Sequence, residues 1–263
     1  MKSAKVQTVC DAMNRLAPKH LAEEWDNPGL LIGNPNNEVK KIIICLDISE
    51  EVIKRAIESK AQMIVTHHPM IFKAIRSIRT DLPLGIYISN LLKNDISVFA
   101  AHTNLDSAEG GVNDVLAEKL GLIEVKTFDE ELSLGRIGKL SQEMTAEEFA
   151  RHVKKALKAD FVRLTNAGEF KVKKVGICGG AGSEFISKAK FLGADAFVTG
   201  DVKYHEAQAA VSNKIHVVDA GHFATEFPIV HALADKLKSE FERLNIDIEI
   251  VEDVQSKDFF TIV

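Results

Sequence analysis

The segments VKKIIICLDISEEVIKRAIESKAQMIVT (39–66) and VKKVGICGGAGSEFISKAKFLGADAFVT (172–199) decide the fold, because they align without a gap when the sequence is shifted by 133 positions. Eleven of their 28 positions are identical, including the Val-Lys-Lys opening and the closing Val-Thr. A self-similarity of this length and quality indicates an internal duplication.

Each copy of the repeat reads as an apolar strand, a turn with a helix-start signal, an amphipathic helix and a second apolar strand that ends in Thr. This is the order of a βαβ unit, whose parallel strands need helices on the faces of the sheet. The similarity continues into ISVFAAH (96–102) and IHVVDAGH (215–222). Each copy therefore gains a further strand that ends near a histidine.

Other segments add elements around these two units. Residues 132–140 alternate like a strand, and residues 145–157 predict a helix with Thr145 as its N-cap. Residues 230–244 predict a long helix, and residues 246–251 predict a strand that returns to the first lobe.

We therefore expect an α/β protein with two similar lobes, each a mixed sheet flanked by helices. The predicted first lobe comprises residues 1–125 and 222–263, and the predicted second lobe comprises residues 126–221. Because no Ser/Gly-rich linker separates them, we expect tightly joined lobes with a binding site in the cleft between them.

The composition excludes several classes of protein. A hydrophobic fraction of 46% and a charged fraction of 27% are those of a soluble globular chain. The net charge of -5 argues against a nucleic-acid partner. Three cysteines without CxxC spacing indicate buried thiols in a reducing cytoplasm, and no apolar stretch is long enough to span a membrane.

Two adjacent histidines, His67 and His68, follow the second strand of the first copy. Open α/β sheets bind their ligands at this carboxyl end of the strands. Neighbouring residues on extended backbone point in opposite directions, so these two imidazoles suit two different metal ions.

Both lobes also deliver a histidine and a carboxylate four residues apart: His102 with Asp106, and His222 with Glu226. Imidazole and carboxylate together suit zinc, iron or manganese, and a carboxylate can bridge two ions about 3.5–4 Å apart. We expect Glu226 to be that bridge. The predicted metal ligands, which we expect in the cleft between the lobes, are His67, His68, Asp106, His222 and Glu226. The alternative is that these histidines end strands and bond to backbone carbonyls. We expect His20, His152, His216 and His231 to be ordinary structural residues.

The second copy has Gly200-Asp201 where the first has His67-His68, so the site should be asymmetric. Asp201, Tyr204 and His205 face the cleft in one interpretation, as groups that move protons or orient ligands, and Asp201 is a helix cap in the other.

Two further motifs leave alternatives open. The loop at 179–183, Gly-Gly-Ala-Gly-Ser, is either a tight turn or a phosphate cradle of exposed amides. The segment 24–30 contains the only Trp, Trp25, and either lines the cleft or locks a turn.

Six strings in order, WDNPGLLIG, THHPMIF, AAHTNLDSAEGGVND, CGGAGSEFI, TGDVKYHEA and DAGHFATE, resemble the Nif-three-like family, also called the GTP cyclohydrolase I type 2 homologs. The resemblance covers nearly the whole chain. It implies His68 and Asp106 on one metal ion, His67 and His222 on the other, and Glu226 bridging both. It also implies a short form without an inserted domain, and a ring-shaped homohexamer.

The resemblance and the predicted ligands together favour a metal-dependent hydrolase. We expect two divalent ions per subunit to activate water against a small-molecule substrate, such as a nucleotide of the GTP kind, with Glu226 bridging the ions and His102 or His205 moving protons. A metal carrier or regulatory interaction protein is the alternative, and a purely structural role for the metals is a third. The sequence names neither the metal nor the substrate.

Overall fold

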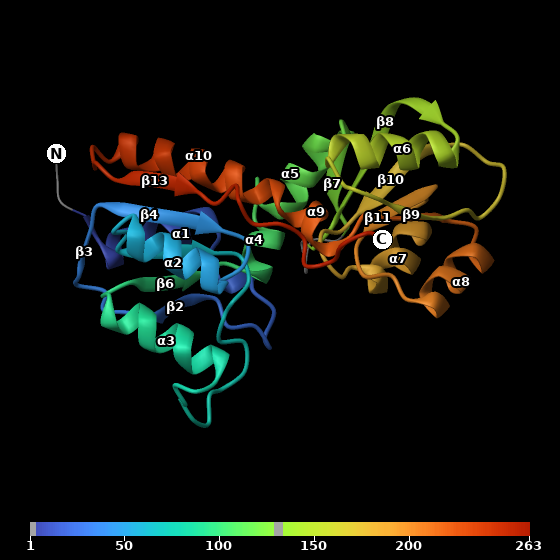
Figure 1. The fold of residues 1–263 in the computed structure, drawn as a ribbon. Helices are drawn as coiled ribbons and strands as arrows, with labels where there is room; N and C mark the ends of the chain where they lie inside the picture. Colours follow the sequence, from blue (N-terminus) through green and yellow to red (C-terminus); the bar gives the residue numbers. More distant parts are fainter. Residues whose placement is uncertain (1–3, 129–133) are drawn as a thin grey trace. The chain divides into compact units, whose positions relative to one another are not determined.

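The computed structural model describes residues 4–128 and 134–263, and they form two compact units (Figure 1). Of these residues, unit 1 contains 4–108 and 229–256, and unit 2 contains 109–128, 134–228 and 257–263. Both are α/β, as expected from the repeat. No helix within the described residues is both long and apolar enough to cross a membrane.

Unit 1 is built on a five-stranded sheet in the order β13-β4-β5-β6-β2. The strands in this order are β13 (Glu249–Glu252), β4 (Lys41–Cys45), β5 (Met63–Thr66), β6 (Ser97–Ala100) and β2 (Gly29–Ile32). The first four run parallel, and β2 runs antiparallel to β6. A short antiparallel pair joins β1 (Ala4–Lys5) to β3 (Glu38–Val39).

Helices cover both faces of this sheet. They are α1 (Val6–Leu16), α2 (Glu50–Glu58), α3 (Pro83–Lys93), α4 (Thr103–Ser107) and α10 (Pro228–Arg243), with a 3₁₀ turn at Lys19–Leu21. Ile43, Ile64 and Val98 share one core cluster with α2 and α3, whereas the alternate residues Ile42 and Met63 are buried outside that cluster. A parallel sheet with both faces buried explains why its strands read as continuous apolar runs.

Unit 2 has a six-stranded sheet in the order β7-β8-β10-β11-β12-β9. The strands in this order are β7 (Ile123–Thr127), β8 (Arg136–Met144), β10 (Val172–Ile177), β11 (Ala196–Thr199), β12 (His216–Asp219) and β9 (Arg163–Thr165). The central three run parallel and the outer three antiparallel to their neighbours. The helices are α5 (Val112–Lys119), α6 (Ala146–Ala156), α7 (Ile186–Phe191), α8 (Tyr204–Ser212) and α9 (His222–Glu226), and Ser183–Phe185 forms a 3₁₀ turn.

Two separate core clusters hold these helices on the sheet of unit 2. Val175 and Val198 pack with residues of α5 and α6 in one cluster. Phe197 and Val217 pack with residues of α7 and α8 in the other. Because side chains alternate along a strand, the two clusters lie on opposite faces of the sheet.

The strand pairing of the two units has the same register under the shift of 133 positions. Ile42 pairs with Met63 in unit 1, and the equivalent residues Val175 and Ala196 pair in unit 2. A duplication would produce this agreement, because pairing register is specified by which residues face the core.

The helix predicted around 145–157 is confirmed as α6, and the Thr145 side chain caps it by accepting a hydrogen bond from the amide of Glu148. The long predicted helix is α10, and the last predicted strand is β13, which pairs with β4 in unit 1. The strand predicted at 132–140 is β8, shifted toward the C-terminus; residues 132 and 133 lie outside the described residues.

The unit boundaries differ from the predicted lobe boundaries. Residues 109–125, 222–228 and 257–263, which we expected in the first lobe, group with unit 2. The reason is packing: α5 contacts β8 and β10, and α9 contacts α5. His222 and Glu226 therefore belong to the same unit as the glycine loop, whereas His67, His68 and Asp106 belong to unit 1.

All three cysteines are buried thiols. Burial raises the pKa of Cys10 to about 11 and that of Cys45 still further. Neither thiol is therefore a nucleophile at neutral pH.

Candidate metal centre

His67 and His68 lie directly after β5, and a hydrogen bond fixes each ring. Nδ1 of His67 donates to the backbone carbonyl of Ala101 at 2.9 Å. Nδ1 of His68 donates to Oδ1 of Asp47 at 2.8 Å. A carbonyl oxygen only accepts, so Nδ1 of His67 carries the proton. In the neutral ring this leaves the lone pair of the other nitrogen, Nε2, for a cation.

His102 follows β6 and is oriented in the same way. Its Nδ1 donates to Oδ1 of Asp26 at 2.9 Å. The other oxygen of Asp26 accepts from the amide of Thr103 at 3.0 Å and from its hydroxyl at 2.5 Å. The Asp26 side chain is fully buried. Burial raises its pKa, but the hydrogen bonds from His102 and Thr103 outweigh burial and lower the pKa to about 2.

Unit 1 gathers these imidazoles with a carboxylate. Ring nitrogens of His67, His68 and His102 all lie within 4.8 Å of one another. Nε2 of His67 lies 3.6 Å from Oδ1 of Asp106, a buried residue of α4. This distance favours His67 and Asp106 on the same ion, whereas the resemblance implies Asp106 with His68.

In unit 2, His222 and Glu226 are the first and last residues of α9. Nδ1 of His222 donates to Oδ2 of Asp201 at 2.7 Å, and Nε2 lies 3.1 Å from Oε2 of Glu226. Glu226 is buried. The helical spacing of four residues therefore brings an imidazole nitrogen and a carboxylate oxygen into the range of one ion.

The glycine loop is packed against this pair. Amides in the loop bond to protein oxygens: Gly179 to Oδ1 of Asn113, Gly180 to Oγ1 of Thr225 and Gly182 to Oγ1 of Thr199. These bonds favour the tight turn over the phosphate cradle. A Cβ at Gly180 would lie 2.2 Å from Oε1 of Glu226, so a side chain there would displace the Glu226 carboxylate.

The remaining predicted residues differ in their contacts. Asp201 is no longer ambiguous, because its carboxylate orients His222. His205 is exposed in the first turn of α8, and its contacts are with Gln208 and Tyr204. These local contacts give its predicted proton-transfer role no support. His152 and His216, which we expected to be structural, bond to backbone groups.

Sequence reasoning missed Asp47 and gave Asp26 no role of its own. Asp47 lies two residues beyond β4, so an acid just past an apolar strand was the available signal. Asp26 is adjacent to the only Trp, but its partner His102 is 76 residues away. Neither sequence spacing nor periodicity points to that pairing.

A second group with metal-type residues, His231, Asp235 and Glu252, lies on α10 and β13. Nζ of Lys238 is 3.1 Å from Glu252 and 3.5 Å from Asp235. The ammonium group of Lys238 already pairs with both carboxylates, so we interpret the group as a surface ion-pair network.

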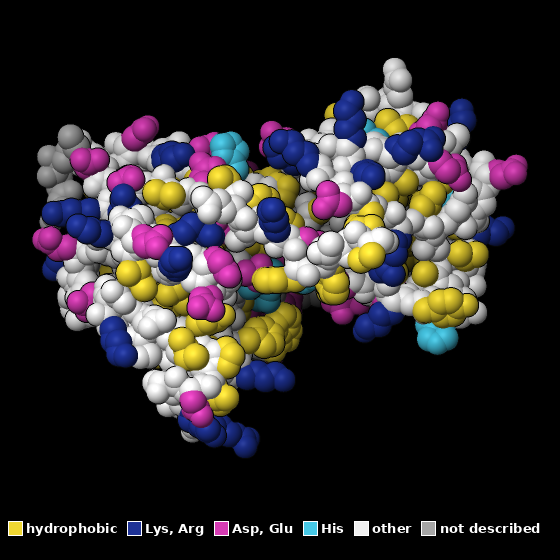
Figure 2. All heavy atoms as spheres, in the orientation of Figure 1, with side chains coloured by type: hydrophobic (Ala, Val, Ile, Leu, Met, Phe, Trp, Pro, Cys, Tyr) yellow, Lys and Arg dark blue, Asp and Glu magenta, His cyan; other side chains and the backbone are white. Residues whose placement is uncertain are grey.

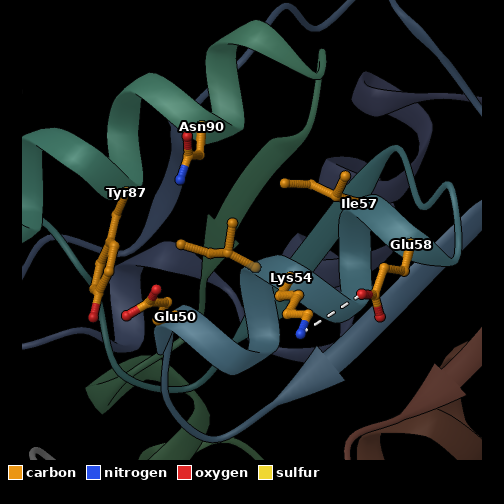
Figure 3. Close-up of a pocket in the computed structure, with 7 residues that line it drawn as sticks. Glu50, Lys54, Ile57, Glu58, Tyr87 and Asn90 are labelled. Carbon is orange, nitrogen blue, oxygen red and sulfur yellow. Dashed lines mark ion pairs between the residues drawn. The ribbon is translucent and has the colours of Figure 1, made fainter.

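A groove of about 310 Å³ between α2 and α3 contains none of the histidines (Figure 3). It is lined by Glu50, Ile53, Lys54, Ile57, Glu58, Tyr87 and Asn90. Its ion pair, Lys54 with Glu58, is long at 3.9 Å. On the face drawn in Figure 2, positive and negative side chains are intermixed, in accord with the low net charge.

Residues 4–258 match the family model for Duf34/NIF3 (NGG1p interacting factor 3). A GTP cyclohydrolase 1 type 2 homolog of Clostridium perfringens is 37% identical over 98% of this chain and 100% of its own length.

Solved structures give the same relationship. The Bacillus cereus protein related to NIF3 superimposes with a TM-score of 0.95 at 28% identity, covering 100% of both chains. Reduced HcgD from Methanocaldococcus jannaschii superimposes with a TM-score of 0.83 at 32% identity, covering 96% of this chain and 98% of its own.

Proposed function

This chain belongs to the Duf34/NIF3 family, and from that premise we propose that it binds two divalent metal ions and uses them for hydrolysis. The proposed ligands are His67, His68, Asp106, His222 and Glu226, with Glu226 bridging the ions. One observation carries the proposal: His67, His68 and His222 each have Nδ1 held by a carbonyl or a carboxylate. Metal-binding histidines are oriented in this way, because the bond fixes the ring and makes the other nitrogen a better ligand.

The donor set also supports a metal that accepts both nitrogen and oxygen. Three imidazoles and two carboxylates suit zinc, iron or manganese better than calcium or magnesium, which prefer oxygen ligands alone. The two carboxylates would offset part of the charge of the ions within a buried environment, since Asp106 and Glu226 are both buried.

Two divalent ions, when bound, would supply a water molecule with a pKa near 7. The chain itself supplies the group that would exchange protons with the substrate. His102 is held by Asp26 with Nε2 directed away from that carboxylate, and a buried acid that orients an imidazole is a common arrangement for general acid–base work. Glu226 would hold the ions at the spacing that hydrolysis needs.

The substrate class is carried over from the relatives named GTP cyclohydrolase 1 type 2 homolog. We propose a small molecule of the nucleotide kind, such as GTP. The homohexamer, the cytoplasmic location and the role of His205 stay predictions.

The test combines metal analysis with a panel of nucleotides and phosphoesters, applied to the wild type and to Glu226→Gln. The control is Glu169→Gln, which changes an exposed glutamate of the same unit. We expect Glu226→Gln to lose bound metal and turnover with the fold intact, and the control to keep both. Metal content and turnover equal to wild type in Glu226→Gln would contradict the proposal. Bound metal without turnover of any compound would favour the metal carrier.

A further inference from the structure

Two large aromatic side chains of unit 1 are exposed beside His102. Trp25 is 59% exposed and Phe72 is 44% exposed. Their ring centroids lie 5.7 Å apart in an edge-to-face arrangement. The His102 ring lies 6.2 Å from Trp25 and 6.1 Å from Phe72, again edge-to-face. The three rings therefore form one contiguous aromatic surface that includes a group of the candidate site.

The aromatic surface is exposed although burial of the indole would be more favourable. Beside the exposed indole, the carboxylate of Asp26 is fully buried and accepts the hydrogen bonds of His102 and Thr103. Hydrophobicity alone would bury the indole of Trp25 and expose the carboxylate of Asp26 to water. The backbone at this point is therefore fixed by polar bonds that keep Trp25 outward.

A second bond fixes the distance between the two aromatic residues. Nδ2 of Asn27 donates to the carbonyl of Ile71 at 2.7 Å, which ties the segment of Trp25 to that of Phe72. Both segments are thus positioned before any ligand arrives. Preorganised aromatic groups bind at a lower entropic cost than groups that must be ordered on binding.

We propose that Trp25 and Phe72 form a stacking site for the planar heteroaromatic ring of the substrate, holding that ring beside His102. The proposal rests on the proposed function and names the part of the substrate that is recognised. When two rings meet edge-to-face, one ring can still offer a face for stacking. The other ring then borders the stacked ligand on one side. Trp25 can donate one hydrogen bond and Phe72 none, so the site has few polar groups with which to tell one base from another. We expect it to prefer a planar ring over a sugar without distinguishing among bases.

Trp25 is the only tryptophan, so its fluorescence reports on this site directly. The probes are guanosine, GTP and ribose 5-phosphate, titrated into the metal-loaded wild type. We expect guanosine and GTP to quench the emission and ribose 5-phosphate to leave it unchanged. Equal quenching by all three, or by none, would overturn the proposal.

Calorimetry with guanosine then tests the side chains. We expect Trp25→Ala and Phe72→Ala to weaken binding roughly tenfold to a hundredfold, the loss typical of one stacked base, and Trp25→Phe to weaken it less. The control is Phe191→Ala, which removes an aromatic ring that is 89% exposed on unit 2 and should leave binding unchanged. Metal content should be unchanged in all four variants.

Two outcomes distinguish this proposal from its alternatives. Wild-type affinity for guanosine in Trp25→Ala, with an altered sedimentation coefficient, would overturn the proposal and assign the surface to a second copy of the chain. Guanosine binding that depends on Trp25, in a protein that turns over no nucleotide, would support the stacking site while contradicting the proposed hydrolysis.

Discussion

Oδ1 of Asp47 lies 2.8 Å from Nδ1 of His68, and Oδ2 of Asp201 lies 2.7 Å from Nδ1 of His222. The two pairs belong to different units, yet each has the same chemistry: a carboxylate orients an imidazole through Nδ1. Both acids follow strands of the repeated βαβ units, β4 for Asp47 and β11 for Asp201. The carboxyl ends of these strands thus supply the orienting acids, and the histidines follow the adjacent strands β5 and β12.

Replacing Asp47 should weaken metal binding without unfolding the protein. In Asp47→Ala, Nδ1 of His68 loses its acceptor, so the ring can rotate and its other nitrogen becomes a weaker ligand. We expect a loss of about 10- to 100-fold in metal affinity, measured by competition with a chelating dye. Asp81→Ala, at an exposed aspartate of the same unit, is the control and should bind metal like the wild type. Equal metal affinities for the two variants would show that Asp47 does not support the metal centre.

Gly180 should not tolerate a side chain. Its φ is +62°, and an added Cβ would lie 2.2 Å from Oε1 of Glu226. We expect Gly180→Ala to lose about 1–2 kcal/mol of unfolding free energy from backbone strain, and in addition to displace the Glu226 carboxylate and lower metal affinity. Chemical denaturation and the same dye competition measure the two effects.

The variant Gly193→Ala tests the effect of backbone strain without displacement of the Glu226 carboxylate. Gly193 also has a positive φ, +84°, but the nearest atom to its Cβ would be Nζ of Lys174 at 3.7 Å. We expect a comparable loss of stability with unchanged metal affinity. If Gly193→Ala lowers metal affinity as much as Gly180→Ala, general destabilisation explains both results and the contact with Glu226 has no special role.

The sequence was sufficient to predict much of the local structure, including the strand–helix–strand order of both copies of the repeat. Ser49 caps α2 as its helix-start signal predicts, because its side chain accepts from the amide of Val52. The shift of 133 positions puts Gly182 at the equivalent place, where no side chain can cap. The second copy accordingly begins with the 3₁₀ turn Ser183–Phe185 before the short helix α7. The second copy therefore lacks the side-chain cap with which α2 begins.

Contacts between residues far apart in the sequence could not be predicted from sequence patterns. His102 could be recognised as a chemically important residue from its place after a strand, but its bond to Asp26 depends on how two distant loops meet. The compact units differ from the predicted lobes for the same reason, since the contacts of α5 with β8 and β10 are tertiary. Periodicity specifies which face of an element is buried, whereas it does not specify the partner of that face.

Glu240 should contribute stability that depends on pH. Hydrogen bonds from Arg243 and from Arg15 lower its pKa from 4.5 to about 2, and the Arg15 bond joins α1 to α10. A group whose pKa is lower in the folded state stabilises above its unfolded pKa and loses that contribution as pH falls toward the folded value. We expect Glu240→Gln to cost about 0.5–1 kcal/mol at pH 7, as surface ion pairs do, and progressively less between pH 4.5 and pH 2.

Unfolding by urea at several pH values measures this difference. Glu242→Gln, at an exposed glutamate of the same helix, is the control for the loss of one negative charge. A cost for Glu240→Gln that stays constant down to pH 2.5, or that equals the cost of Glu242→Gln at pH 7, would contradict the assignment of the ion pair.

Asp26 should be the most costly of these residues to replace. In Asp26→Ala, Nδ1 of His102 and both donors of Thr103 lose a buried acceptor, and an unsatisfied buried donor costs about 1–3 kcal/mol. Because Trp25 is the adjacent residue, the same change should release its segment and increase quenching of its fluorescence by acrylamide. Asp11→Ala, at an exposed aspartate of α1, should change neither quantity. A loss of stability without increased quenching would mean that Asp26 stabilises the fold but does not position Trp25, whose outward orientation would then need another cause.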